Sequence, residues 1–216
     1  TKQVWCGECG PHNGGGLPNV TDTFASIFWY ADALGSLAAQ GAPEFGRQAL
    51  LGGNYALLDA ARGYAPNPDF YVAQLWTATM GPAVLRATVR GAGTPGPTGT
   101  EAHAYAHCAP GGGASLAVVN PQNRSVTLRV AFSPAEPGST ARRDEWVLSG
   151  REGAPRGVWL NGAGLAPPPD GLPDLPPARR QGGALVVPPA SVAFVRYPDL
   201  ALPACAEALP RGGAEA

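Results

Sequence analysis

Charged residues are scarce in this sequence of 216 residues. They make up 14% of the chain, against about 25% in a typical soluble domain. The formal net charge is only −1. The arginine pairs Arg142-Arg143 and Arg179-Arg180 are too small to form a basic surface for a phosphate backbone. The sequence therefore excludes nucleic acid as a partner.

Long apolar runs are also missing. No run approaches the roughly 18 residues that a membrane-spanning helix requires, so we expect no transmembrane span. The first residues, Thr1 to Trp5, contain neither an initiator methionine nor a signal-like start, and they look like the middle of a strand. We therefore expect the chain to be a fragment of a longer protein.

Glycine and proline, by contrast, are abundant, with 30 and 24 residues. Both favour strands, turns and loops over long helices. The hydrophobic fraction of 44% is enough to bury a core of ordinary size. A chain of this length holds one large domain or two small ones.

Strand patterns alternate with helical patterns in residues 1–83. Val4–Gly7 and Arg47–Leu51 are short strand candidates. Apolar residues that recur at spacings of three and four predict helices over Thr21–Gln40 and Phe70–Met80. The order strand, helix, strand, helix is typical of an α/β fold.

The pattern changes to period two in residues 84–205. Proline- and glycine-rich stretches over Gly91–Thr100 and Gly162–Gln181 are expected to be loops, and residues 206–216 a disordered tail. The rest of residues 84–205 contains about eight strand candidates, a number that suits an all-β sandwich. They are Val84–Arg90, Ala102–Cys108, Ser115–Asn120, Ser125–Phe132, Glu145–Leu148, Gly157–Asn161, Ala184–Val187 and Ala190–Tyr197.

Four cysteines and the sequons that begin at Asn19 and Asn123 are consistent with the secretory pathway and with glycosylation of both asparagines. Cys108 ends one strand candidate and Cys205 follows the last one. These two cysteines either form a disulfide or remain as two buried free thiols. A disulfide would tie the C-terminal end of the chain to the predicted sandwich.

The segment Trp5-Cys6-Gly7-Glu8-Cys9 allows three interpretations. A thioredoxin-like redox site requires a helix that begins at the motif, and the following Gly10–Gly16 cannot form one. A zinc site could use Cys6, Cys9 and His12 with His107 or Cys108 as the fourth ligand, but a second closely spaced ligand pair is missing. The third interpretation concerns Glu8, a carboxylate at the C-terminal end of a strand, where barrel enzymes hold catalytic groups.

Six segments support this third interpretation because they occur together, in the order and with the spacing of one known family. They are Trp5–Glu8, Gly14–Gly16, Arg47–Tyr55, Pro68–Tyr71, Met80–Leu85 and Tyr105–Cys108. Together they resemble the heparanase-like family, glycoside hydrolase family 79, and most of all its plant branch. The resemblance implies the C-terminal portion of a (β/α)8 TIM barrel in residues 1–83, followed by a β-sandwich in residues 84–205.

The resemblance also assigns roles to single residues. Glu8 matches the nucleophile of a retaining hydrolysis of β-glucuronide bonds. Gly14, Gly15 and Tyr55 match the residues that bind the carboxylate of the sugar, and Gln48 lines the same cleft. Backbone amides without side chains can approach an anion closely, which suits the two glycines. No metal and no cofactor is implied.

The family's sandwich disulfide matches Cys108 and Cys205. Its substrates imply a glucuronide-containing glycan or a small glucuronide as the partner of the site. Its members suggest an extracellular, cell-wall, lysosomal or vacuolar location, or a peripheral place on a membrane.

The chain nevertheless has room for only two of the eight barrel units, since a complete barrel needs about 250 residues. The family's acid/base glutamate lies in an Asn-Glu-Pro context, which this sequence lacks. We therefore expect this chain to be the C-terminal part of a glycosidase, inactive alone and completed by an upstream segment. The alternative is a non-catalytic β-sandwich that binds carbohydrate or a protein partner.

Overall fold

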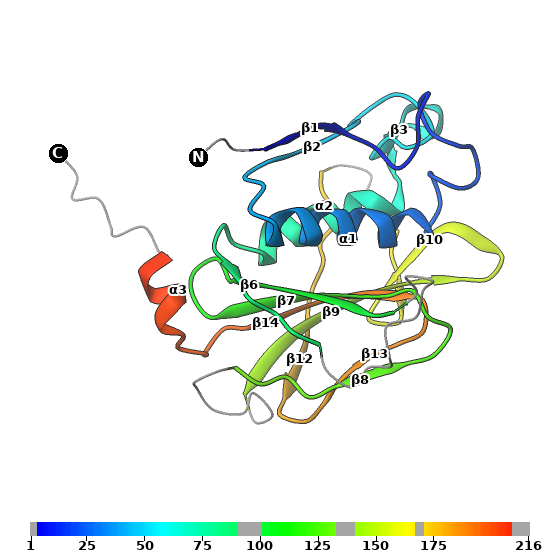
Figure 1. Ribbon diagram of the computed structural model, residues 1–216. Helices are drawn as coiled ribbons and strands as arrows, with labels where there is room; N and C mark the ends of the chain where they lie inside the picture. The colour runs from blue at the N-terminus through cyan, green and yellow to red at the C-terminus, as the bar shows by residue number, and fades with distance from the viewer. Residues whose placement is uncertain (1–3, 90–100, 133–140, 167–170, 209–216) are drawn as a thin grey trace.

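The computed structural model describes residues 4–89, 101–132, 141–166 and 171–208. The molecule is layered, as Figure 1 shows: a small parallel sheet lies on two helices, and the helices lie on a large antiparallel sheet. A second small sheet, β8 (Val126–Leu128) with β13 (Leu185–Val187), lies across the opposite face of the large one. None of the helices in the described part of the chain is long and apolar enough to cross a membrane.

The N-terminal part has the expected order of strand, helix, strand and helix. Strands β1 (Cys6–Cys9) and β2 (Phe45–Arg47) are parallel, with α1 (Ser26–Ala39) between them and α2 (Pro68–Thr79) after them. The prediction of a strand over Arg47–Leu51 was wrong, because β2 ends where that range begins. Short elements fill the connection to α2: β3 (Leu58–Asp59), the 3₁₀ helix η1 (Ala60–Arg62) and β4 (Ala65–Pro66).

The large sheet is antiparallel throughout, with the strand order β11-β10-β9-β14-β7-β6-β5 and with β12 beside β9. The expected loop over Gly162–Gln181 was wrong in part, because it contains β11 and β12. The other expected loop, Gly91–Thr100, lies outside the described residues. The strands are β5 (Val84–Leu85), β6 (His103–Cys108), β7 (Ala114–Asn120), β9 (Arg142–Arg151), β10 (Ala154–Leu160), β11 (Ala163–Gly164), β12 (Ala178–Gln181) and β14 (Ser191–Tyr197).

Both faces of the central strands are buried. In β7, Ala117 and Val119 pack towards the helices, whereas Leu116 and Val118 pack towards β8 and β13. This is the alternation that a pleated strand imposes. The helix side forms one core, in which Ile27 and other side chains of α1 and α2 contact side chains of β7, β9, β10 and β14. The helices of the N-terminal part and the large sheet therefore share a single hydrophobic core.

The second layer on the far face is smaller than the sandwich that the sequence predicts. In the described residues it consists of β8 and β13, and β8 spans three residues where a strand over Ser125–Phe132 was expected. Leu185 and Val187 of β13 are fully buried beneath the large sheet. Two strands thus cover one face of a much larger sheet.

The C-terminal end of the chain is joined to the sheet by a disulfide. Cys205 lies in α3 (Pro203–Ala208) and is bonded to Cys108 at the end of β6, with a Cα–Cα distance of 5.3 Å. The prediction of a disordered tail from residue 206 was therefore wrong at its start, because α3 extends to Ala208. Residues 209–216 lie outside the described part.

A buried ion pair joins the elements of the N-terminal part. Arg47, at the end of β2, places its Nη2 2.7 Å from Oδ2 of Asp69 in α2, and the two side chains are 6% and 2% exposed. Ser26, the first residue of α1, donates a hydrogen bond to the other carboxylate oxygen of Asp69. Burial raises the pKa of Asp69, and the Ser26 hydroxyl and Arg47 partly offset this effect. The pair holds α1, β2 and α2 together through three side chains.

We expect Asp69→Asn to lower the free energy of unfolding by about 3–5 kcal/mol, because it leaves the buried Arg47 guanidinium without its counter-charge. Urea unfolding followed by circular dichroism measures the change. Asp199→Asn is the matched control: it breaks the Arg142–Asp199 pair, whose side chains are 43% and 64% exposed, and should leave the unfolding curve unchanged. Equal losses in both variants would contradict the role of the buried pair.

We expect Cys108→Ser/Cys205→Ser to lower the free energy of unfolding by about 2–5 kcal/mol, because the disulfide closes a long loop of the unfolded chain. The sequence separation of its cysteines is 97 residues. The double variant Cys6→Ser/Cys9→Ser opens a loop with a separation of only 3 residues and should lose less. Thermal unfolding measures both variants. A larger loss of stability in Cys6→Ser/Cys9→Ser than in Cys108→Ser/Cys205→Ser would show that loop length does not govern the stabilisation.

Candidate active site

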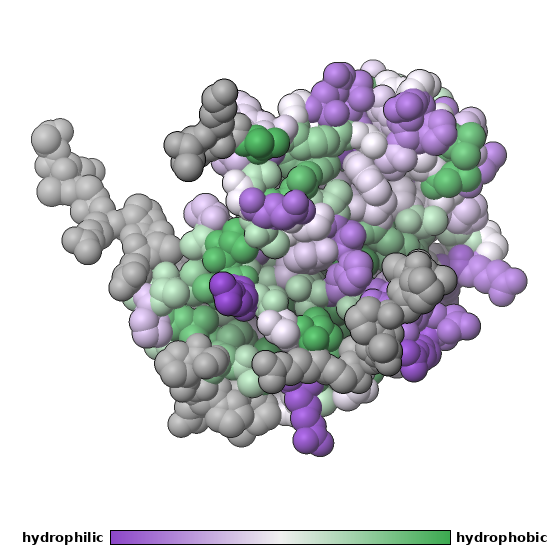
Figure 2. All heavy atoms as spheres, in the orientation of Figure 1, coloured by the Kyte–Doolittle hydropathy of each residue, from purple (hydrophilic) through white to green (hydrophobic). Residues whose placement is uncertain are grey.

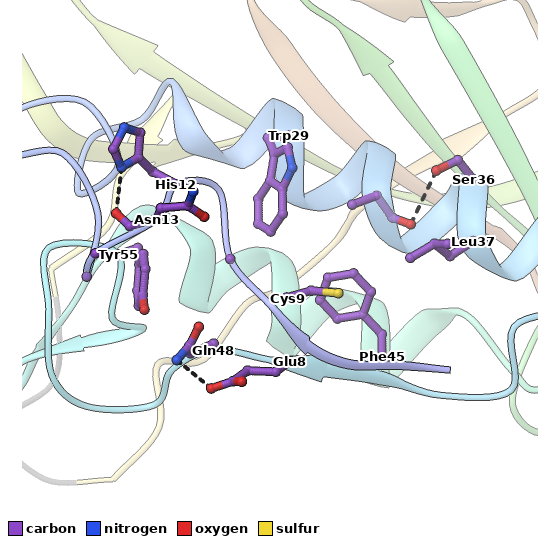
Figure 3. Close-up of a pocket in the computed structure, with 14 residues that line it drawn as sticks. Glu8, Cys9, His12, Asn13, Trp29, Ser36, Leu37, Phe45, Gln48 and Tyr55 are labelled. Carbon is purple, nitrogen blue, oxygen red and sulfur yellow. Dashed lines mark hydrogen bonds between the residues drawn. The ribbon is translucent and has the colours of Figure 1, made fainter. Parts of the chain in front are cut away.

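A groove of about 670 Å³ runs between β1, the loop that follows it, the end of β2 and one side of α1. All five site residues expected from the sequence line it: Glu8, Gly14, Gly15, Gln48 and Tyr55. Figure 3 shows the side chains that converge on this space from the two strands and from the helix. The remaining lining residues are Cys9, Gly10, His12, Asn13, Trp29, Ala33, Ser36, Leu37 and Phe45.

Glu8 and Gln48 meet across the two parallel strands. Glu8 lies in β1, and Gln48 follows the last residue of β2. The Nε2 amide of Gln48 donates a hydrogen bond of 2.7 Å to Oε1 of Glu8, and the two side chains point toward one another in Figure 3. Because parallel strands place their carboxyl ends at one edge, residues far apart in sequence reach the same groove. The carboxylate is therefore held by a neutral donor and remains open to the groove.

The glycine loop has the backbone conformation that its sequence suggests. Gly14 and Gly15 have φ values of 64° and 86°, in the left-handed region that favours glycine. A Cβ on Gly14 would meet no atom within 4 Å, so this part of the loop faces open space. The carbonyl of Gly15 accepts a hydrogen bond of 2.5 Å from the amide of Asn54. This contact joins the loop to the second glycine-rich segment, which leads to Tyr55.

Arg47 organises the aromatic wall beside the groove. Its guanidinium lies 5.5, 5.1 and 5.8 Å from the ring centroids of Trp29, Tyr30 and Tyr55. It also donates a hydrogen bond of 2.7 Å to the carbonyl oxygen of Tyr55. Burial raises the pKa of Tyr30 to about 12, although the positive charge of Arg47 acts in the opposite direction. Arg47 thus holds the backbone from which Tyr55 extends, and Asp69 neutralises its charge.

Sequence reasoning missed the wall of the groove that α1 provides. Trp29, Ala33, Ser36 and Leu37 all line the groove, on a different face from the core residue Ile27. Their spacing, i, i+4, i+7 and i+8, is that of a second helical stripe. Trp29 in this second stripe was the one feature of the sequence that could have indicated a groove-facing side of the helix. The helix therefore serves the core with one face and the groove with another.

Cys6 and Cys9 are joined by a disulfide, which the sequence interpretation left undecided. Cys108 is bonded to Cys205, and Nδ1 of His107 is 2.6 Å from the carbonyl oxygen of Gly81. The zinc hypothesis was therefore wrong for this set of ligands. Within the described residues, no group of three or more histidine, cysteine, aspartate or glutamate side chains could hold a metal ion.

The two sequon asparagines are both exposed. Asn19 has a φ of 59° in the loop that leads to α1, and Asn123 lies in the turn between β7 and β8. Neither side chain lines the groove. Both asparagines therefore lie at the surface of the described part of the chain.

The chemistry of the groove is limited by its acidic groups. Among the described residues that line it, Glu8 is the single carboxylate. A carboxylate with one hydrogen-bond donor beside it can act as a nucleophile or as a base. Retaining and inverting glycosidases, however, both use a pair of carboxyl groups. The described lining of the groove thus contains one carboxyl group, whereas such a reaction needs two.

Comparison with known proteins gives relatives over nearly the whole chain. Baicalin-β-D-glucuronidase from Scutellaria baicalensis is 36% identical over an alignment of 204 residues, which covers 92% of this chain and 37% of that protein. Heparanase-like protein 1 from Arabidopsis thaliana is 34% identical over 236 aligned residues, covering 93% of this chain and 42% of that protein. The chain thus spans about two-fifths of the length of these relatives. No protein-family model matches it.

Solved structures agree at the level of the fold. A β-porphyranase of glycoside hydrolase family 86 from Bacteroides plebeius superposes with a TM-score of 0.55 and 11% identity, over 94% of this chain and 36% of that one. The structural neighbours are glycoside hydrolases of the TIM-barrel type. The curated relatives are heparanase-like proteins and a β-D-glucuronidase, in agreement with the resemblance to the heparanase-like family, glycoside hydrolase family 79, that the sequence motifs indicate.

Proposed function

We propose that this chain forms the C-terminal part of a retaining glycosidase that hydrolyses β-glucuronide bonds, with Glu8 as the nucleophile. The observation that carries the proposal is the position of Glu8 in the groove, at the end of β1 and hydrogen-bonded to Gln48. In this mechanism the Glu8 carboxylate attacks the anomeric carbon and displaces the aglycone, and water then hydrolyses the glycosyl ester. The Gln48 amide fixes the orientation of the carboxylate for that attack.

The carboxylate of the glucuronide has a binding site in the same groove. The backbone around Gly14 and Gly15 is free of side chains, so its amides can approach an anion closely. The Tyr55 hydroxyl supplies a further donor. The described lining contains neither lysine nor arginine, which favours a substrate with a single carboxylate over a heavily sulfated polymer. A small glucuronide or a terminal glucuronide of a glycan meets this requirement.

An upstream segment of the same protein would complete the barrel and supply the acid/base glutamate. In the described residues, β1 and β2 pair only with one another, so each has one unpaired edge. Many of the large apolar side chains exposed in the described chain lie in this N-terminal part, among them Val4, Trp5 and Leu50. Figure 2 shows apolar residues interspersed with polar ones on the face that it draws. Unpaired strand edges and exposed apolar side chains are the features that a missing barrel segment would cover.

The same proposal extends to the layout and location of the protein. Residues 1–83 are the last two strand–helix units of the barrel, and residues 84–205 are a β-sandwich domain, although the two share a core. The exposed Asn19 and Asn123 carry N-linked glycans. The enzyme follows the secretory pathway to the cell exterior, the cell wall, the lysosome or the vacuole, or to the periphery of a membrane.

In the longer enzyme that contains this chain, we expect Glu8→Gln to lower kcat towards an aryl β-glucuronide by about 10⁴-fold or more, because the amide cannot form the glycosyl intermediate. A 2-deoxy-2-fluoro glucuronide with a good leaving group should label Glu8, as peptide mapping by mass spectrometry would detect. Glu152→Gln, an exposed glutamate in the turn between β9 and β10, is the matched control and should retain full activity.

The 216-residue chain alone should show no hydrolysis above that of its Glu8→Gln variant, because it lacks a second carboxylate in the described groove. Activity of the chain alone, lost on Glu8→Gln, would contradict the need for an upstream segment. Label on a different residue of the longer enzyme would contradict the assignment of Glu8. Binding of a glucuronide without hydrolysis by the longer protein would instead favour a carbohydrate-binding protein.

A further inference from the structure

The disulfide between Cys6 and Cys9 surrounds the proposed nucleophile in the sequence. Gly7 and Glu8 are the two residues between its cysteines, and Cys9 itself lines the groove. Both cysteines are half-buried. No helix begins at the motif, since α1 starts only at Ser26. The pair thus lacks the helix N-terminus that lowers the pKa of a thiol in dithiol redox enzymes, and a different role must explain its position.

The backbone between the two cysteines departs from a regular strand. Their Cα atoms are 6.0 Å apart, whereas three residues of a regular strand span about 10 Å. The pairing with β2 shows the cause: Cys6 is opposite Phe45 and Cys9 is opposite Arg47, so β1 has one residue more than β2 between the same two points. This extra residue is a β-bulge. Bulges are frequent next to active sites, where they change the direction of a side chain.

The neighbouring strand is fitted to this bulge. A Cβ on Gly46 would lie 2.3 Å from the carbonyl oxygen of Gly7, so only glycine allows β2 to approach so closely. Backbone hydrogen bonds flank the irregular segment: the amide of Cys6 donates to Glu44 and the amide of Gln48 donates to Cys9. The second of these bonds also fixes the residue whose side chain holds Glu8. The bulge, the disulfide and the Glu8–Gln48 contact thus form one local unit.

We propose that the Cys6–Cys9 disulfide is a positioning clamp that holds the bulge in β1 and thereby directs Glu8 into the groove. A Cα separation of 6.0 Å lies within the range of about 4.4–6.8 Å that a disulfide spans. An unclamped strand can extend and pair in regular register with β2, and a shift of one residue turns a side chain to the opposite face of the sheet. The clamp excludes that alternative. Its catalytic consequence rests on the proposed function of Glu8.

The clamp forms by ordinary thiol–disulfide exchange with a small-molecule disulfide such as oxidised glutathione. One cysteine thiolate attacks a sulfur of oxidised glutathione and releases one glutathione. The second cysteine thiolate attacks the mixed disulfide and releases the other. The two cysteine thiols lose two protons and two electrons, one S–S bond forms in the chain and one breaks in oxidised glutathione.

Two measurements on the 216-residue chain test the clamp without any enzymatic activity. Alkylation of free thiols before reduction, followed by peptide mapping, should leave Cys6 and Cys9 unmodified; alkylation of both would overturn the proposal. In NMR spectra, the side-chain amide resonance of Gln48 should shift when Glu8 is replaced by Gln, and should shift in the same way in Cys6→Ser/Cys9→Ser. An unchanged resonance in the double serine variant would show that Glu8 keeps its position without the clamp.

The catalytic consequence is measured in the longer enzyme. Cys6→Ser/Cys9→Ser should lower kcat by about 10²-fold, the effect of a displacement of about 1 Å at a reacting group, and should change KM by no more than about twofold because Gly14, Gly15 and Tyr55 remain in place. The matched control Cys108→Ser/Cys205→Ser should keep kcat below its unfolding temperature. Circular dichroism verifies that both variants fold. Reduced wild type should regain kcat when treated with oxidised glutathione.

The possible outcomes separate the two proposals. Equal kcat in wild type and Cys6→Ser/Cys9→Ser overturns the clamp and leaves the proposed function intact. If Cys6→Ser/Cys9→Ser loses kcat only to the extent that circular dichroism shows it to be unfolded, the disulfide merely stabilises the fold, and the clamp proposal is overturned. An inactive wild type contradicts the proposed function, and the Gln48 resonance then decides whether the clamp positions Glu8.

Discussion

The buried ion pair between Arg47 and Asp69 is the constraint on which the candidate site depends. Removing two charges from water costs several kcal/mol per ion, and this cost is offset only where geometry and further hydrogen bonds are good. Here Ser26 satisfies one oxygen of Asp69, and Arg47 reaches the carbonyl oxygen of Tyr55. Through these bonds the pair fixes the end of β2 against both helices. Gln48, the next residue in the chain, is thereby placed where it can hold Glu8.

The large sheet provides the foundation for this arrangement. The helices are not a separate unit, because their apolar side chains share one core with β7, β9, β10 and β14. Polar contacts reinforce the same interface. Nδ1 of His103 and the hydroxyl oxygen of Tyr105, both in β6, each lie 2.5 Å from Oδ1 of Asp32 in α1. Gly35 permits the close approach, since a Cβ there would overlap the ring of Tyr105. The sheet therefore holds α1, and α1 in turn forms a wall of the groove.

Much of the fold was predictable because local periodicity reports burial. Helical spacing located α1 and α2, and alternation located β7 and β14, whose two faces pack against different cores. Strand β9 was predicted too short, from Glu145, because charged residues precede it. In the structure Arg143 is buried with Glu145 at 2.6 Å and donates to the carbonyl of Gly182. No local pattern shows that the backbone carbonyl oxygens of a distant loop will accept hydrogen bonds from a buried guanidinium.

Some features of the candidate site were also predictable from the sequence, and others were not. The residues around Glu8, the glycine loop and Tyr55 were identified by their order and spacing along the chain. The sequence by itself indicated the resemblance to the heparanase-like family, through the order and spacing of its motifs. It also indicated the succession of strands and helices, because that succession depends on local periodicity. Only the tertiary structure decided that Gln48 holds Glu8, that Trp29 faces the groove and that the Cys6–Cys9 disulfide encloses a bulge. Those contacts depend on how parallel strands and a helix pack against one another, which local sequence does not encode.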